Sequence, residues 1–306
     1  MTTHNGELAL PMPADVAPRE RIDPRRLRAI IVGSAGNLVE WFDFYCYAAF
    51  ALYFANSFFP AQDPTAQMMS TAGIFALGFF IRPIGGFIFG HIGDRHGRRI
   101  ALMISVLLMC LGSLLIACAP TYAVAGIWSP AILLLARLLQ GLSLGGEYGA
   151  SATYLSEMAG AKRRGFWSSF QYVTLIMGQL VALAVLLVLQ SVLSERALEQ
   201  WGWRIPFAIG GALALIVLIL RRRLMETEHF ERATAQTDAR RSGFAALIRH
   251  HPGAAALVIA LTAGGTLAFY TYSTYMQKYL VNSSGFSRES ASWIMAAALF
   301  CFMCLQ

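Results

Sequence analysis

Five acidic or basic residues lie well inside the first, second and fourth long apolar stretches of this chain. A charged side chain near the centre of a bilayer costs at least about 2.5–3.5 kcal/mol, and such residues usually face a partner, a cavity or a transported ion. We therefore treat each one as a candidate for function. They are Glu40, Asp43, Arg82, Arg137 and Glu147.

The first apolar stretch carries its polar residues on one helical face. At about 100° per residue, Asn37, Glu40, Asp43 and Tyr47 of GNLVEWFDFYCY share a stripe about 120° wide. Such a stripe favours a water-filled cavity, and two acids three residues apart repel each other there and hold protons more readily than in water. We predict proton coupling by Glu40 or Asp43, with Glu147 as a third candidate. The alternative is an ordinary contact between helices.

The buried arginines could bind an anion. Arg137 and Glu147 of LLLARLLQGLSLGGEYG are about 15 Å apart along a helix, near one face but not in contact. Arg137 should therefore find Glu40, Asp43 or an anionic substrate. Arg82 of FFIRPIGGFIFG precedes Pro83, which kinks helices. It could bind a carboxylate with two parallel hydrogen bonds, snorkel to the surface, or pair with Asp43.

A polar seam follows the seventh apolar stretch at every fourth residue. We predict that Tyr270 and Lys278 bind substrate, although Lys278 could instead be an interfacial anchor. The seam consists of Thr262, Thr266, Tyr270, Thr274 and Lys278.

The elements that would position these residues are membrane-spanning helices. Hydrophobic residues make up 57% of the chain and charged residues only 13%, against about 25% in soluble domains. The net charge of +7 arises from short basic segments between apolar runs, which indicates membrane topology rather than nucleic-acid binding. We expect an all-α membrane protein with no metal site. Its eight predicted spans are 29–54, 68–90, 100–119, 130–158, 166–192, 204–222, 254–280 and 289–306.

The spans group into unequal parts. If the chain crosses the membrane at each span, most Lys and Arg residues lie in the tail and in connecting segments on the same side of the membrane. Basic residues concentrate on the cytoplasmic side, so we predict a cytoplasmic N-terminus. The predicted parts are a cytoplasmic tail (1–28), a six-helix bundle (29–222), a cytoplasmic connector (223–253) and a partial second bundle of two helices (254–306).

Gly141, Gly145 and Gly149 form repeated G-x-x-x-G spacings, which predict close helix packing.

A short charged loop separates the second and third spans. Its spacing, G-x-x-x-D-R-x-G-R-R, resembles the loop 2–3 signature of the major facilitator superfamily. We expect its glycines to permit a tight reversal and its charges to act as a conformational latch, a contact that closes the cytoplasmic side during the cycle. The loop residues are Gly90, Asp94, Arg95, Gly97, Arg98 and Arg99.

The stretches YVTLIMGQL and YMQKYLVN extend the resemblance to the metabolite:proton symporter family. It covers nearly the whole chain from about residue 25. It implies symport of a dicarboxylate, 2-oxoglutarate, with protons into the cell by alternating access across a bacterial inner membrane. Other family members carry citrate, shikimate, proline or betaine. It implies no cofactor besides the coupling proton, and no enzymatic activity; the partners would be the substrate and the lipid bilayer, not nucleic acid.

The family has two six-span halves, and residues 254–306 supply two spans. We therefore expect a C-terminally truncated chain that lacks about four spans of the second half. Transport would then require a separately supplied C-terminal portion. A substrate sensor that does not transport and an inert fragment are the alternatives.

Overall fold

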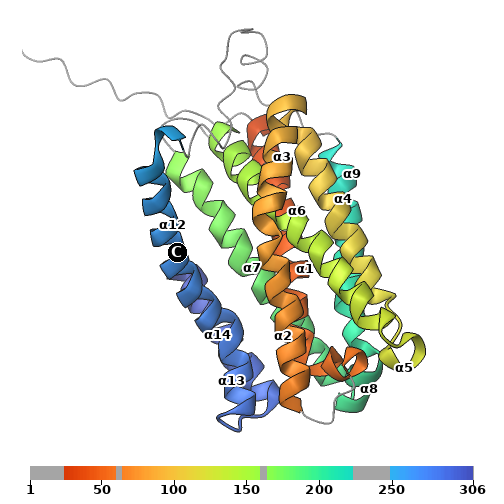
Figure 1. Cartoon of the computed structure of the whole chain (residues 1–306). Helices are drawn as coiled ribbons and strands as arrows, with labels where there is room; N and C mark the ends of the chain where they lie inside the picture. Colours follow the sequence, from red (N-terminus) through yellow and green to blue (C-terminus); the bar gives the residue numbers. More distant parts are fainter. Residues whose placement is uncertain (1–23, 60–63, 159–163, 223–248, 306) are drawn as a thin grey trace, which may run out of the picture.

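The computed structural model describes residues 24–59, 64–158, 164–222 and 249–305. Within these ranges every regular element is helical (Figure 1). The elements are α1 (Pro24–Phe58), α2 (Pro64–Phe80), α3 (Arg82–His96), α4 (Arg98–Ala117), α5 (Tyr122–Ala125), α6 (Trp128–Met158), α7 (Arg164–Val192), α8 (Glu195–Gln200), η2 (Gly202–Arg204), α9 (Ile205–Arg221), α12 (Pro252–Tyr270), the π-helical η3 (Thr271–Tyr275), α13 (Met276–Asn282) and α14 (Arg288–Leu305).

Seven helical segments of the described chain are long and apolar enough to cross a membrane. They correspond to the second to eighth of the eight spans predicted from apolar runs, and the first span is not among them. That span is α1, whose 35 residues include the predicted polar stripe. The seven segments are Thr65–Gly93, Arg99–Ala117, Trp128–Tyr148, Ser169–Val192, Gly202–Arg221, Pro252–Asn282 and Arg288–Leu305.

Helix α1 lies at the centre of the bundle. It packs against α6, α7 and α9, and nearly every side chain from Asn37 to Ala55 is buried. Its polar residues therefore face other helices rather than lipid, which explains why its sequence is less apolar than that of its neighbours. Helix α14 packs on α7, whereas α12 is exposed along most of its length (Figure 1).

Pro83 interrupts the second span, as the sequence predicts. Helix α2 ends at Phe80 and α3 begins at Arg82, with a turn at Ile81 between them. The proline has no N–H to donate to the carbonyl one turn earlier. The break leaves Arg82 at the start of α3, near the middle of the span.

Gly97 makes the reversal between α3 and α4. Its φ of 102° lies in the region that favours glycine, and its N–H donates to the Gly93 carbonyl at 3.2 Å. Gly90 lies inside α3, so the prediction that it shapes this turn is wrong. Arg95 is exposed, and Arg99 donates to the Arg222 carbonyl at 2.7 Å. The side chains of Asp94 and Arg98 lie outside the described part, and the latch stays a prediction.

The helix ends that adjoin the predicted basic segments lie together. The start of α1, the α3–α4 junction, the end of α6, the end of α9 and the start of α12 lie at one end of the molecule, with α5, α8 and the α13–α14 turn at the other (Figure 1). The tail to residue 23, the segment 159–163 and most of the connector, 223–248, lie outside the described residues. The bounds of the four predicted parts and the cytoplasmic position of the N-terminus stay predictions.

Glycines bring the backbones of α2, α3 and α6 together. A Cβ on Gly85 would collide with the Leu142 backbone, and one on Gly141 with the Gly78 backbone. A Cβ on Gly145 would lie 2.7 Å from the Arg82 Cα. These contacts confirm the predicted packing role of Gly141 and Gly145.

Gly145→Ala is expected to destabilise the bundle by about 1–3 kcal/mol, because overpacking would push α3 away from α6. The matched control is Gly90→Ala in α3, where an added Cβ has no neighbour within 4 Å. There, alanine should be neutral or stabilising by up to about 1 kcal/mol. Thermal unfolding of both variants in lipid nanodiscs measures the difference. Equal midpoints would contradict the close packing.

Candidate functional site

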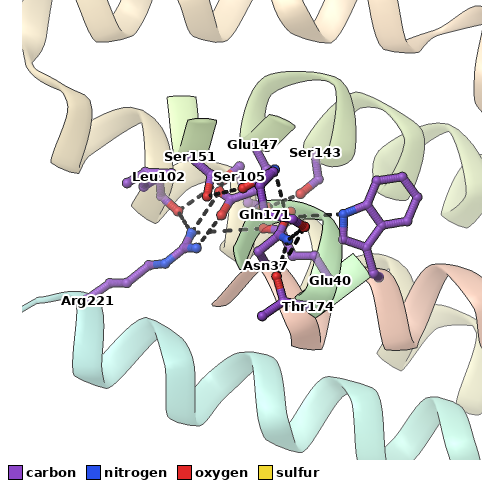
Figure 2. Close-up of polar contacts among 11 residues, drawn as sticks. Asn37, Glu40, Leu102, Ser105, Ser143, Glu147, Ser151, Gln171, Thr174 and Arg221 are labelled. Carbon is purple, nitrogen blue, oxygen red and sulfur yellow. Dashed lines mark hydrogen bonds and ion pairs between the residues drawn. The ribbon is translucent and has the colours of Figure 1, made fainter. Parts of the chain in front are cut away.

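A buried ion cluster joins α1, α6 and α9 (Figure 2). Arg221 forms a bidentate salt bridge with Glu147: its Nη1 donates to Oε2 at 2.9 Å, and its Nη2 pairs with Oε1. The same Nη1 donates to the Leu102 carbonyl at 2.8 Å, and the Ser105 hydroxyl donates to Glu147 Oε2 at 3.0 Å. Arg221 and Glu147 are both fully buried. The cluster is therefore a buried, hydrogen-bonded ion pair.

Glu40 lies at the edge of this pair. Its Oε1 is 4.0 Å from Arg221 Nη1, and its side chain is 1% exposed. Neither of its oxygens has a hydrogen-bond partner. Gly36, one turn earlier on α1, leaves room for the guanidinium, because a Cβ there would lie 2.7 Å from Arg221 Cζ. Arg221 thus lies near both acids, and it hydrogen-bonds Glu147.

Asn37 ties the polar stripe of α1 to α7 (Figure 2). Its Nδ2 donates to the Gln171 carbonyl at 3.0 Å and to Thr174 Oγ1 at 2.7 Å. Its Oδ1 accepts from Trp41 Nε1 at 3.1 Å and from Gln171 Nε2 at 3.2 Å. This part of the stripe makes helix–helix hydrogen bonds, which is the alternative considered for it above.

Asp43 lies in a second polar cluster, between α1, α4 and α6. Its Oδ2 accepts hydrogen bonds from the Ser113 hydroxyl and, at 2.8 Å, from Gln140 Nε2. The side-chain amide oxygen of Gln140, Oε1, in turn accepts from Arg137 Nη1 at 2.7 Å. Gln140 therefore connects the acid to the arginine, and all four side chains are fully buried.

Arg137 and Arg82 lie against a shared aromatic side chain. Each guanidinium carbon is 4.3 Å from the centre of the Phe44 ring. Arg137 also lies 4.4 Å from the Tyr47 ring, and Arg82 lies 4.0 Å from that of Phe79. Cation–π contacts of this kind stabilise a desolvated cation without neutralising it.

The hydrogen-bonding capacity of these two arginines is only partly used. Within the described residues, no carboxylate approaches either side chain within 4.0 Å. Nε and Nη2 of both arginines are buried and lack hydrogen-bond partners. The site therefore holds cationic donors that an anion could satisfy.

Residues of η3 and α13 complete a small pocket against α1 and α7. The Tyr270 hydroxyl, at the end of α12, accepts from Arg82 Nη1 at 3.3 Å. Lys278 donates to the Ala48 carbonyl and to Gln277 Oε1 at 3.3 Å. No carboxylate in the described residues pairs with Lys278. The pocket is lined by Tyr45, Ala48, Ala49, Gln179, Ala182, Leu183, Ser273, Thr274, Gln277, Lys278 and Met295.

The structure brings together many of the residues that the sequence singles out. Arg82 meets Tyr270, and Asp43 connects to Arg137, whereas Arg82 does not pair with Asp43. Lys278 lines the pocket, which favours a binding role over an interfacial anchor. The polar seam is interrupted, because Thr262 and Thr266 are exposed. The π-helical turn of η3 also shifts the four-residue register before Lys278.

Arg221 is the main residue that sequence reasoning missed. It opens a run of three arginines at the end of a span, which is typical of an ordinary basic flank. The helical periodicity of α9 could have identified Arg221 as buried. Ala214, Val217, Leu218 and Arg221 share the buried face of α9.

The comparisons with known proteins define the class first. The fold matches that of the xylose transporter XylE from E. coli in a partially occluded, inward-open conformation. The TM-score is 0.70 at 18% identity, over 92% of this chain and 71% of XylE. XylE is a proton:xylose symporter of the major facilitator superfamily. The chain is thus a multi-pass membrane protein with a major facilitator fold: a six-helix half followed by two further spans.

The sequence then gives the family. Residues 29–255 match the family described as "Sugar (and other) transporter", and the chain belongs to it. The alpha-ketoglutarate permease of Escherichia coli K12 is 55% identical over 92% of this chain and 64% of its own length. The citrate-proton symporter of Klebsiella pneumoniae is 38% identical over 82% and 56%, and proline/betaine transporters also match. The chain thus spans less than two-thirds of these relatives, which are transporters and not enzymes.

Proposed function

We propose that this chain binds a small dicarboxylate, 2-oxoglutarate, and couples its movement into the cell to protons. The observation that carries the proposal is the pair of arginines on Phe44. Arg82 and Arg137 are buried or half-buried, have no carboxylate partner among the described residues, and retain unused donors. An anion that accepts these hydrogen bonds would offset the cost of holding two cations in a poorly hydrated site.

A second cationic position favours a dicarboxylate over a monocarboxylate. Lys278 lies in the pocket between α1, α7 and α13. Arg82 does not line this pocket, but it donates to Tyr270, which precedes Lys278 by eight residues in the same span. In the proposal, Arg82 with Tyr270 holds one carboxylate, Lys278 holds the other, and Arg137 supplies positive potential behind Phe44. The 55% identity to an alpha-ketoglutarate permease supports this choice of substrate.

Asp43 is the proposed coupling site. When ionised, it accepts hydrogen bonds from Gln140 and Ser113, and its charge offsets that of Arg137 through Gln140. A proton on Asp43 removes that negative charge. Arg137 then attracts the substrate anion more strongly, so that proton and dicarboxylate favour each other's binding.

Substrate binding to the purified chain tests the proposal. We expect labelled 2-oxoglutarate to bind in lipid nanodiscs and Arg82→Gln to weaken binding about 10- to 100-fold, the loss of about 1.5–3 kcal/mol for a charged hydrogen bond. Arg196→Gln removes the same charge from an exposed position and should leave binding unchanged.

Competition identifies the class of substrate. Unlabelled dicarboxylates should displace 2-oxoglutarate, and proline and betaine should not. If Arg82→Gln and Arg196→Gln bind the label equally well, the anion site is wrong. If citrate displaces the label at lower concentration than 2-oxoglutarate itself, the substrate is a tricarboxylate.

The proposed setting is a bacterial inner membrane with the N-terminus in the cytoplasm, as the basic segments predict. Protons are the only coupling species in this proposal. The latch at the α3–α4 junction and a separately supplied C-terminal portion stay predictions.

A further inference from the structure

We infer that Glu40 is a proton-binding site separate from Asp43, and that Arg221 exchanges between Glu147 and Glu40 when that proton leaves. The inference deepens the proposed proton coupling. It depends on the geometry of one cluster, and its test requires neither substrate nor transport. Its failure is therefore distinguishable from failure of the proposed function.

The charges of the cluster do not balance if both acids are ionised. Arg221 from α9 faces Glu147 from α6 and Glu40 from α1, and Asp43 is the next acid along α1. Among the described residues, the hydrogen-bonding groups that α4 and α7 place in this cluster are uncharged: Ser105 and a carbonyl from α4, and Gln171 and Thr174 from α7. One guanidinium against two carboxylates leaves a buried negative charge.

The hydrogen bonds indicate which acid carries the proton. Glu147 accepts from both terminal nitrogens of Arg221 and from Ser105, as a carboxylate would. Glu40 accepts from no donor, although it is almost fully buried. A neutral carboxylic acid tolerates such surroundings far better than a carboxylate does. A proton on Glu40 makes the cluster neutral.

The geometry also provides the alternative partner. Glu40 Oε1 is already 4.0 Å from Arg221 Nη1. Gly36 has no side chain between the guanidinium and α1, so the arginine can lie against that helix. Once Glu40 loses its proton, its charge competes with Glu147 for Arg221. Movement of the guanidinium would then change the contact between α9 and α6, the two helices that this ion pair joins.

Infrared spectroscopy of the whole chain in lipid nanodiscs tests the inference. The C=O band of a protonated carboxylic acid is separate from carboxylate bands. We expect the wild-type protein to show such a band in mildly acidic buffer, and Glu40→Gln to remove the part of it that Glu40 contributes. Asp43→Asn identifies the contribution of Asp43, and the Glu40 band should persist in that variant. Raising the pH should convert the Glu40 band to a carboxylate band.

Stability distinguishes a proton site from a structural acid. Glutamine resembles protonated Glu40 in shape and charge, so Glu40→Gln should unfold within a few degrees of the wild-type midpoint. A carboxyl band that is unchanged in Glu40→Gln would overturn the inference. So would failure of Glu40→Gln to fold, because an essential carboxylate cannot be the protonated form that we infer.

Discussion

Arg221→Met is expected to lower the free energy of unfolding by about 3–5 kcal/mol, the typical cost of removing one partner from a buried ion pair. Among the described residues, the substitution would leave Glu147 with the Ser105 hydroxyl as its remaining donor, and it would remove the cation that both Glu147 and Glu40 approach. Thermal or denaturant unfolding in mixed micelles measures the loss. We expect the effect to be the largest of any single arginine replacement at the ends of the spans.

Arg288→Met is the matched control. Arg288 pairs with Glu195 at 3.0 Å and Glu199 at 2.9 Å, but these acids are well exposed. Exposed ion pairs contribute about 1 kcal/mol or less. In the Arg221→Met background, Glu147→Gln should recover part of the loss, because it removes the unpaired carboxylate. Equal destabilisation by Arg221→Met and Arg288→Met would show that the buried cluster contributes no more to the free energy of unfolding than an exposed ion pair does.

Asp43→Asn is expected to abolish the pH dependence of substrate binding. In the wild-type protein, affinity for 2-oxoglutarate should fall as the pH rises, because ionised Asp43 offsets the charge of Arg137 through Gln140. A coupling free energy of about 1–3 kcal/mol corresponds to a 5- to 150-fold change in affinity. Asparagine resembles the protonated acid, so the variant should bind tightly at every pH. Equilibrium binding across a pH series measures this.

An exposed acid provides the control for that experiment. Glu199→Gln removes an exposed carboxylate from α8, a helix at one end of the molecule (Figure 1), and should leave the pH profile unchanged. If Asp43→Asn retains the wild-type pH profile, the coupling proton binds elsewhere, and Glu40 becomes the first alternative. If it loses binding altogether, the carboxylate itself is required for the site.

Much of the fold follows from hydropathy and from the Gly and Pro residues that interrupt or end helices. The apolar runs predict the second to eighth spans, Pro83 predicts the break between α2 and α3, and Gly97 predicts the reversal after α3. The apolar run 29–54 also predicts α1, although the polar stripe makes that run less apolar than the others. The buried position of α1 at the centre of the bundle means that its composition reflects neighbouring helices rather than lipid.

The candidate site is less predictable from the sequence. Which side chains pair depends on how each helix is rotated about its axis and how deep it lies in the bundle. The sequence identifies Asp43 and Arg137 as charged residues within spans, but not that Gln140 lies between them. Arg221 looks like a flanking charge until α9 is placed beside α1 and α6. The π-helical turn before Lys278 is also set by packing, since no proline or glycine marks it within Thr271–Tyr275.

Proton uptake on substrate binding tests the central claim most directly. 2-Oxoglutarate is added to the purified chain in weakly buffered nanodiscs, and the pH of the medium is followed. If dicarboxylate and proton favour each other's binding, the medium should become more alkaline in proportion to substrate bound, and Asp43→Asn should bind substrate without that change. Substrate binding by the wild-type chain with no uptake of protons would contradict the account.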